Sequence, residues 1–364
     1  MTMLPTLAYF HGEPESLGQL RTEMADFKVF EQLPFLPCGE GEHLLIHLRK
    51  TGLNTIFVAR ALAKYFAVKE MLVSYAGLKD RFAVTEQWFG IHVPGKTDYD
   101  LSDLVIEGVE VLSYQRHNKK LRIGTLSGNR FELTLRNVTN IEALEKRWQQ
   151  IINHGVPNYF GEQRFGIDGN NIDKAKALFQ GQKVKDKKKR GIYLSAARSY
   201  LFNQVVSKRI EHQYFERLNT GDVCMLSGTQ SIFVVENVDD TLKQRFIERD
   251  IDLTAPMWGA GELKTQGETL VFEQQVIDDY PEFTEGLPRF GLKQERRRIR
   301  LSLSDAEMAV EEINKERCEE NQQYTHTVIL NFSLPAGSYA TTILRELLQY
   351  NDMTERADSQ GNIN

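Results

Sequence analysis

The arrangement of strand-like segments constrains this fold more than any other feature of the sequence. Before Gly155, four segments show the two-residue period of β-strands: residues 26–31, 42–48, 85–93 and a stretch that begins at Gly128. The pattern then becomes irregular and resumes only at residues 325–332. We therefore predict an α+β protein in which a middle domain, residues 155–303, is inserted into a discontinuous domain formed by residues 1–154 and 304–364.

Helix signals lie among these strands. Asn54 can cap a helix that runs through Val68, and an amphipathic pattern predicts a second helix over residues 141–152. Three further helices are predicted: from Ser195 towards Leu218, over the acidic segment from Asp305, and from the turn at residues 335–337 through Leu348. A length of 364 residues is consistent with two domains.

The chain carries no sequence signal of secretion, membrane insertion or a metal centre. Its N-terminal region lacks a basic stretch followed by an apolar one, and no apolar run is long enough to span a bilayer. The cysteines Cys38, Cys224 and Cys318 lie far apart, and His43 and His47 belong to a strand-like segment without the glutamate of a zinc-protease motif. We therefore expect a cytoplasmic protein without a metal ion or contact with a membrane.

Basic residues form clusters, although the formal net charge of the chain is −5. Three segments are rich in lysine and arginine: residues 116–122, 183–190 and 293–300. Acidic residues concentrate elsewhere, at residues 236–252 and 305–320, so one face of the protein can be positive. Such a face is typical of proteins that bind nucleic-acid phosphates. Each cluster taken alone is more typical of a solvated surface loop.

One predicted loop has the sequence Ala76-Gly77-Leu78-Lys79-Asp80-Arg81, with an aspartate between two cations. Neighbouring positive charge favours the carboxylate form of Asp80, which suits a nucleophile or a general base. Loops on rigid scaffolds are also where catalytic groups tend to lie. A type I turn explains the same residues without any chemistry, and the hexapeptide alone favours the turn.

Seven segments together resemble the TruD family of tRNA pseudouridine synthases. They occur in the order expected for the family and are spread over almost the whole chain. They are residues 26–27 with Glu31, 50–55, 76–81 with Ala83, Thr85 and Gln87, 128–131, 157–166, 194–199 and 334–338. One such motif is weak evidence, whereas seven in order are specific.

The resemblance implies a pseudouridine-synthase catalytic domain with a mixed, mostly antiparallel sheet, into which a family-specific α/β domain, the TRUD domain, is inserted. Residues 1–154 and 304–364 are then the catalytic domain, and residues 155–303 the inserted domain. The implied reaction converts uridine to pseudouridine at position 13 of certain tRNAs without a cofactor, and Asp80 is the implied nucleophile. The implied partner is tRNA, and we expect a monomer.

The implied reaction requires only one carboxylate. Breaking the N-glycosidic bond develops positive charge at C1′ of the ribose, which a carboxylate can stabilise or trap as in retaining glycosidases. The same carboxylate can instead remove a ribose proton as a general base. The sequence leaves both roles of Asp80 open.

The family pattern also implies a pocket for the extruded uridine. Unstacking the base costs roughly a few kcal/mol, and an aromatic platform offsets this cost by stacking on the base. Phe131 is the candidate platform, and Asn129 can hydrogen-bond the uracil edge or the ribose. Phe27, Phe332 and Lys79 complete the predicted substrate-binding set. Without the resemblance, the three phenylalanines are typical of a core and Asn129 of a turn.

Several basic residues are candidates for contacts with tRNA phosphates, which would make binding weaken steeply with salt: Arg81, Arg164, Lys187, Lys188, Lys189, Arg190, Arg296, Arg297 and Arg298. Two other classes of function compete with a synthase. A tRNA-binding or folding module without catalysis would use the basic clusters alone. A zinc-dependent base deaminase is excluded because the chain lacks a Pro-Cys-x-x-Cys pair.

Overall fold

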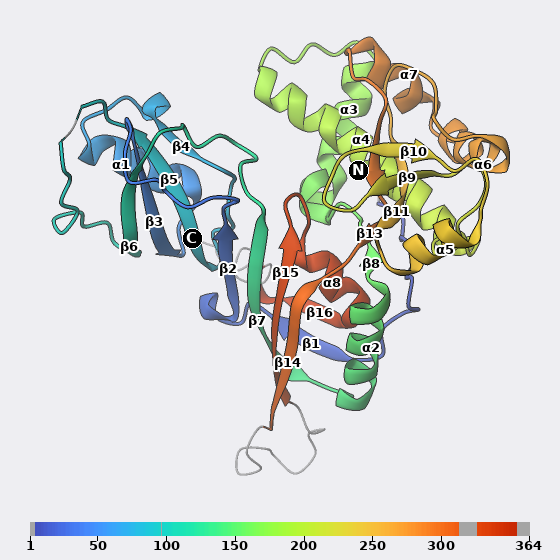
Figure 1. Ribbon diagram of the computed structural model, residues 1–364, viewed down its shortest axis with the longest axis horizontal. Helices are drawn as coiled ribbons and strands as arrows, with labels where there is room; N and C mark the ends of the chain where they lie inside the picture. Colours follow the sequence, from blue (N-terminus) through green and yellow to red (C-terminus); the bar gives the residue numbers. More distant parts are fainter. Residues whose placement is uncertain (1–3, 96, 313–325, 355–364) are drawn as a thin grey trace. The chain divides into compact units, whose positions relative to one another are not determined.

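The structure is a computed structural model that describes residues 4–95, 97–312 and 326–354 (Figure 1). The chain divides into two compact units. The sheet unit contains Glu15–Trp148, Leu303–Ala340 and Leu347–Asn364, and the middle unit contains Met1–Pro14, Gln149–Ser302 and Thr341–Glu346. Helices α2 (Ile141–His154) and α8 (Ala340–Leu347) each contain residues of both units.

The sheet unit is built on a mixed sheet of ten strands within the described residues (Figure 1). Seven strands form the path β14-β15-β7-β2-β5-β3-β6, β1 joins β7 to β16, and β4 pairs with β5. Within this part of the chain, the pairs β2–β5 and β1–β16 are parallel and the others antiparallel. The strands are β1 (Leu17–Leu20), β2 (Phe27–Gln32), β3 (His43–Thr51), β4 (Val73–Tyr75), β5 (Val84–His92), β6 (Val109–His117), β7 (Gly128–Val138), β14 (Ser304–Glu312), β15 (His326–Pro335) and β16 (Gln349–Asp352).

Helix α1 (Thr55–Tyr65) covers part of one face of this sheet. It begins after Asn54, whose side chain accepts a hydrogen bond from the N–H of Phe57 and so satisfies one of the unpaired donors of the first turn. Its apolar residues, such as Leu62, pack in one core cluster with Ile46 of β3 and Phe89 of β5. This cluster is the core on the α1 side of the sheet.

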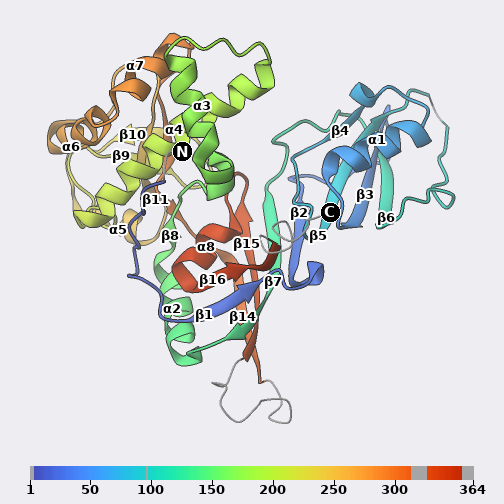
Figure 2. The ribbon, with the colours of Figure 1, turned by 180° about the vertical axis from the view of Figure 1, so that it is seen from behind.

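The middle unit combines helices with a four-stranded antiparallel sheet of order β10-β9-β11-β12. Helix α4 is the longest of its described helices, and it packs against β11 and against α3, α6 and α7 (Figure 2). A second, two-stranded sheet pairs β8 with β13. The elements are β8 (Val156–Pro157), α3 (Asn170–Phe179), α4 (Lys187–Glu211), β9 (Val223–Leu226), β10 (Ile232–Val234), α5 (Asp240–Ile247), β11 (Ile251–Met257), α6 (Gly267–Asp278), α7 (Pro281–Arg289), β12 (Glu295–Arg298) and β13 (Arg300–Leu301).

The predicted fold class is confirmed, because the large sheet is mixed and mostly antiparallel and a second α/β unit accompanies it. The division into a catalytic and an inserted domain stays a prediction. The middle unit also takes in residues 1–14 and Thr341–Glu346, which the predicted boundaries assign to the flanking domain.

Two predicted elements differ from the structure. The segment from Asp305 is not a helix but strand β14, paired with β15 from Ser304–Ser333 to Glu312–His326. Alanine and glutamate are good helix formers, but helix propensity decides structure only weakly, and here pairing with β15 overrides it. The rest of this predicted helix, with Cys318, lies in residues 313–325 and so outside the described residues.

Helix α4 begins at Lys187, earlier than the predicted start at Ser195, and ends at Glu211, before the predicted Leu218. Asp186 is its N-cap and accepts hydrogen bonds from the N–H groups of Lys188 and Lys189. This cap satisfies two donors of the first turn. The basic segment that the sequence predicts as a loop is therefore helical from Lys187 onward.

Candidate active site

Strand pairing in the sheet unit places five buried residues in one row. Lys50 of β3 lies opposite Thr85 of β5, and Thr85 lies opposite Val29 of β2. Val29 lies opposite Phe131 of β7, and Phe131 opposite Phe332 of β15. Directly paired residues point to the same face of a sheet, so all five side chains share one face. All five are buried.

A second pair extends this face. Glu31, two residues beyond Val29 on β2, lies opposite Asn129 on β7. The glycine before Asn129 is required by packing, since a Cβ at Gly128 would lie 2.3 Å from the carbonyl oxygen of Leu334. Glycine at this position permits the close approach of β15 to β7. The predicted Asn129 and Phe131 therefore lie on one face, next to a buried carboxylate.

The loop that carries Asp80 is fixed to the sheet unit by side chains. The backbone N–H of Lys79 donates to Thr55 Oγ1 at 3.0 Å, and Gln87 Nε2 donates to the carbonyl oxygen of Gly77 at 2.6 Å. Thr55 Oγ1 also donates to Gln87 Oε1 at 3.0 Å. Strand β5 thus holds the loop at Gly77, and the first turn of α1 holds it at Lys79, the residue directly before Asp80.

Arg21 holds the carboxylate of Asp80. Its Nη2 lies 3.3 Å from Asp80 Oδ2, and its Nη1 pairs with Asp352 of β16. Its guanidinium carbon lies 4.1 Å from the ring centroid of Phe27. The side chain of Arg21 is 6% exposed, whereas that of Asp80 is 44% exposed. A buried guanidinium therefore orients Asp80 on one side, while the carboxylate stays accessible to a substrate.

Lys79 forms an ion pair on the sheet face. Its Nζ lies 2.8 Å from Glu31 Oε2 and 2.7 Å from Asn129 Oδ1. The lysine side chain is 7% exposed and that of Glu31 is 0% exposed. The prediction of Lys79 as a direct substrate contact is corrected accordingly, because its ammonium is buried and already paired. Lys79 instead donates a hydrogen bond to the side-chain oxygen of Asn129. The NH₂ group of Asn129 then points away from Lys79 and can donate to another group.

The three predicted phenylalanines form one aromatic cluster. The ring centroids of Phe27 and Phe131 are 6.3 Å apart in an edge-to-face arrangement, and those of Phe131 and Phe332 are 5.5 Å apart with an interplanar angle of 26°. Trp148 extends the cluster at 6.1 Å from Phe332. The structure therefore brings these residues together in a buried core. Their contact with uracil stays a prediction.

Lys50 is a buried cation beside the Asp80 loop. Its Nζ donates to the carbonyl oxygen of Leu53 at 2.6 Å and to that of Asp80 at 3.4 Å. Burial lowers the pKa of Lys50 from 10.5 to about 8; the Asp80 charge opposes this shift and the Lys79 charge adds to it. Lys50 therefore supports the Asp80 backbone as a cation only at pH values below about 8.

The sequence prediction omits Arg21, Glu31 and Lys50 as site residues. Glu31 and Lys50 each occupy a core-facing position at the end of an alternating strand, where an unpaired charge would be costly. A charge at such a position is a signal that sequence reasoning could use. Arg21 has no such signal, because only the tertiary fold brings it to Asp80.

The predicted phosphate contacts differ in their accessibility. Arg81 is exposed. In the first turn of α4, Lys187, Lys188 and Lys189 are exposed and Arg190 is half-buried. These side chains can reach an RNA backbone without losing a buried interaction. They remain predicted phosphate contacts.

The remaining arginines are engaged within the middle unit. Arg164 is half-buried, and its Nη1 donates to Ser195 Oγ at 3.1 Å. Arg297 donates to Asn158 Oδ1 at 2.7 Å, and Arg298 donates to the carbonyl oxygen of Leu226. Each of the three is half-buried, so a contact with phosphate stays a prediction.

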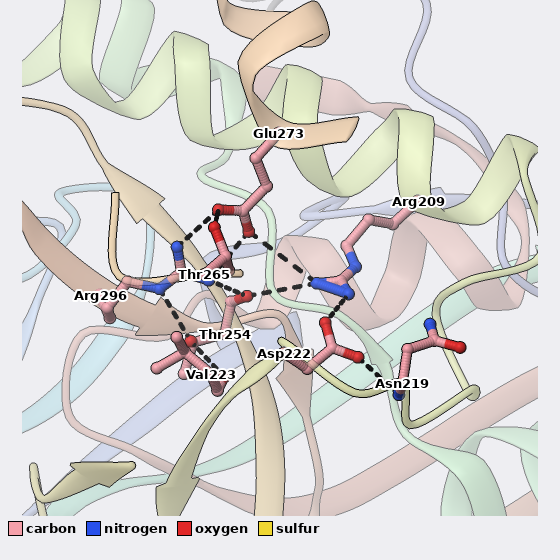
Figure 3. Close-up of polar contacts among 8 residues, drawn as sticks. All are labelled: Arg209, Asn219, Asp222, Val223, Thr254, Thr265, Glu273 and Arg296. Atoms are coloured by element: carbon pink, nitrogen blue, oxygen red, sulfur yellow. Dashed lines mark hydrogen bonds and ion pairs between the residues drawn. The ribbon is translucent and has the colours of Figure 1, made fainter. Parts of the chain in front are cut away.

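Arg296 is not on the surface, which corrects its prediction as a phosphate contact (Figure 3). Its side chain is 1% exposed and pairs with the fully buried Glu273, with Nη1 2.7 Å from Oε2. Its Nε also donates to Thr254 Oγ1 at 2.9 Å. A buried, paired guanidinium cannot bind a phosphate without breaking this network. The sequence does not show that Arg296 is buried while Arg297 and Arg298 are only half-buried, because the three are consecutive residues of the same type.

Within residues 4–95, 97–312 and 326–354, no group of three or more histidine, cysteine, aspartate and glutamate side chains is placed to hold a metal ion. No helix in this part of the chain is both long enough and apolar enough to cross a membrane. Of the cysteines, Cys38 and Cys224 are free thiols.

Comparison with solved structures shows a similar fold over most of the chain. The crystal structure of a TruD protein from Methanosarcina mazei matches with a TM-score of 0.71 at 23% sequence identity, covering 94% of this chain and 95% of that one. At this identity the likeness concerns the fold. The fold expected from the resemblance is thereby confirmed.

Sequence comparison identifies the family. The model of the family tRNA pseudouridine synthase D (TruD) matches residues 4–183 and 170–347. The tRNA pseudouridine synthase D of Colwellia psychrerythraea is 64% identical, with 98% of this chain and 97% of that protein covered. That of Aeromonas hydrophila is 48% identical, with 95% of each covered. The chain belongs to the TruD family of tRNA pseudouridine synthases.

Proposed function

We propose that this protein isomerises uridine-13 of tRNA to pseudouridine, with Asp80 acting on the ribose of the extruded uridine. The geometry of Asp80 carries the proposal. Its carboxylate is accessible, is held by the buried Arg21, and belongs to the unit whose sheet face carries Asn129 and Phe131. A catalytic domain of residues 1–154 and 304–364 with an inserted TRUD domain of residues 155–303 is part of the proposal.

The reaction exchanges one glycosidic bond for another. The bond between uracil N1 and C1′ breaks with its electron pair passing to the uracil, the base turns, and a bond forms between C5 and C1′. N1 gains a proton and C5 loses one, so the product is an isomer and no cofactor is required. Asp80 either forms an ester at C1′ that C5 displaces, or takes a proton from C2′ and returns it.

Other residues of the site orient the groups that contact the substrate. Arg21 directs one carboxylate oxygen of Asp80, and its contact with Asp352 limits its own movement. Asn129, held by Lys79, offers its NH₂ group to the uracil or ribose. Every one of these residues belongs to the sheet unit. A monomer as the active form is part of the proposal. The tRNA substrate supports a cytoplasmic location.

The proposal is tested by mapping pseudouridine at single-nucleotide resolution. Two tRNA transcripts that differ only in uridine or cytidine at position 13 are incubated with the protein, treated with carbodiimide and copied by primer extension. We expect one stop, at position 13, in the uridine transcript only. Stops at other positions would contradict the proposed target. Binding of both transcripts without any pseudouridine would favour the competing non-catalytic tRNA-binding module.

The pH dependence of the reaction is expected to reflect Lys50. As pH rises through about 8, the ammonium becomes neutral and its attraction to the Asp80 segment is lost, so the rate should fall.

The stability of the folded protein should change in the opposite sense. The folded pKa lies below the ordinary 10.5, so the unfolded chain binds more protons between these values and stability rises with pH there. Initial rates of pseudouridine formation and parallel unfolding curves across this range provide the measurement.

A variant separates Lys50 from other titrating groups. Lys50→Met should be slower than the wild type at neutral pH and should lack the fall in rate near pH 8. The same fall in the wild type and in Lys50→Met would show that another group titrates.

The exposed lysines of α4 are expected to contact tRNA phosphates. Replacing Lys187, Lys188 and Lys189 together by glutamine should lower the slope of log Kd against log salt concentration by about three, since each phosphate contact contributes about one. Filter binding of tRNA at several salt concentrations measures this slope. Lys243→Gln, at an exposed lysine of α5, should leave the slope unchanged. Equal slopes in the triple variant and wild type would remove these lysines from the RNA surface.

A further inference from the structure

A cavity of about 780 Å³ lies in the middle unit, apart from the residues proposed for catalysis and for phosphate contacts. Its walls are the C-terminal end of α4, the chain that follows it to Asn219, and the first turns of α6. Small-molecule sites in proteins have volumes of about 300–1,000 Å³. The cavity is therefore large enough for one nucleotide.

A buried network joins these walls (Figure 3). Arg209 of α4 lines the cavity and pairs with Asp222, and its Nη1 lies 4.0 Å from Glu273 of α6. The N–H of Gln266 donates to the carbonyl oxygen of Gly221 at 2.9 Å, a contact that a side chain at Gly221 would prevent, since its Cβ would lie 2.1 Å from the Gln266 oxygen. The cavity is thus preformed.

One end of the cavity attracts anions. The first turn of α6 begins at Gly267, so the N–H groups of Gly267, Glu268 and Thr269 have no acceptor within the helix, and the side chain of Gln266 does not cap them. Such a turn carries partial positive charge and binds phosphate groups. Arg209 does not add a free charge here, because its guanidinium is 1% exposed, pairs with Asp222 and donates to the carbonyl oxygen of Thr254. The exposed cation of the cavity is Arg217.

The other side of the cavity is aromatic. The ring of Phe272 lies 5.5 Å from that of Tyr214 and 5.5 Å from that of His212, edge to face in both cases. Phe272 and Tyr214 are half-buried, so parts of their surfaces face the cavity. Arg217 is exposed at the same site. Half-exposed aromatic rings beside an arginine are typical of surfaces on which single-stranded bases stack.

We propose that this cavity binds one unstacked nucleotide of the RNA, with its base against Phe272 and Tyr214 and its phosphate at the first turn of α6 near Arg217. That the RNA is tRNA rests on the function proposed above. Glu268 is the one acidic residue among those that line the cavity, and its charge opposes the phosphate. The site anchors the RNA through residues of the middle unit, whereas Asp80 belongs to the sheet unit, and it contributes to affinity and not to the chemical step.

The test measures the Kd of tRNA by filter binding for the full-length protein and four variants. Phe272→Leu should raise the Kd about 10-fold through lost stacking. Arg217→Gln should raise it several-fold and lower the salt slope by about one. Glu268→Gln should lower the Kd. The matched control is Arg289→Gln, at an exposed arginine of α7, and it should equal the wild type. Wild-type affinity in both Phe272→Leu and Arg217→Gln would overturn the proposal.

Two further measurements separate the possible ligands and the two proposals. Equilibrium dialysis with adenosine monophosphate and with inorganic phosphate tests the free ligands; loss of their binding in Phe272→Leu or Arg217→Gln without any change for tRNA would overturn an RNA site. Single-turnover rates at saturating protein should equal the wild type in both variants. If the wild type forms no pseudouridine while these variants weaken RNA binding, the cavity proposal stands and the proposed function fails.

Discussion

Replacement of Asp80 by asparagine is expected to lower the rate of pseudouridine formation about 10⁴-fold, the order of loss seen when a catalytic carboxylate is removed. The amide has nearly the same shape, so the loop held by Thr55 and Gln87 should persist. It carries no negative charge to stabilise or trap the ribose cation, and it is not a base. Single-turnover assays at saturating protein measure the chemical step directly.

A matched substitution controls for general effects of removing an acidic group. Asp103→Asn makes the same chemical change at an exposed aspartate of the sheet unit and should leave the rate within a factor of about two, as expected of a surface position. Filter binding should show that Asp80→Asn still binds tRNA. A rate for Asp80→Asn within tenfold of the wild type would exclude Asp80 as the nucleophile or base.

Loss of Glu273 is expected to have the largest effect on stability. Glu273→Gln leaves the buried guanidinium of Arg296 without its counter-charge, while Arg209 keeps Asp222 (Figure 3). Removing one partner of a buried ion pair costs about 3–5 kcal/mol, because the remaining charge stays desolvated. Urea unfolding followed by circular dichroism measures the change in the free energy of unfolding.

Two companion variants test whether the loss of stability comes from the buried charge that remains or simply from the removal of a negative charge. Glu285→Gln removes an exposed glutamate paired with Arg289 and should cost less than about 0.5 kcal/mol. Combining Glu273→Leu with Arg296→Met removes both buried charges and should be more stable than Glu273→Gln, since apolar replacements of similar volume are tolerated. A double variant no more stable than Glu273→Gln would show that the unpaired charge does not cause the loss.

Local signals predict much of the fold. The alternating segments before Gly155 are strands, and Asn54 caps α1, because side-chain period and helix caps depend on neighbours along the chain. The same reasoning fails for the segment from Asp305, which it predicts as a helix and which is strand β14. Its partner strand β15 begins after residues 313–325, so the interaction that makes it a strand is not local.

The sequence motifs also supply the proposed site residues. Asp80, Asn129 and Phe131 are candidates because they belong to distinctive motifs, and all three lie in one unit, while their roles stay predictions. Lys79 and Arg296 show where this reasoning ends. Each lies in a cationic segment and looks like a surface charge, yet each is buried against a glutamate from a different element.

The sequence by itself determined the α+β class, the positions of most strands and the family, and it supplied Asp80 as the proposed catalytic residue, because these follow from periodicity and from motifs of adjacent residues. Only the tertiary structure decided that Arg21 holds Asp80, that Lys79 serves Asn129, and that Arg296 supports the middle unit. Charged side chains have the same local pattern whether they are solvated or paired in a core. Burial decides between these states, and burial depends on residues distant in the chain.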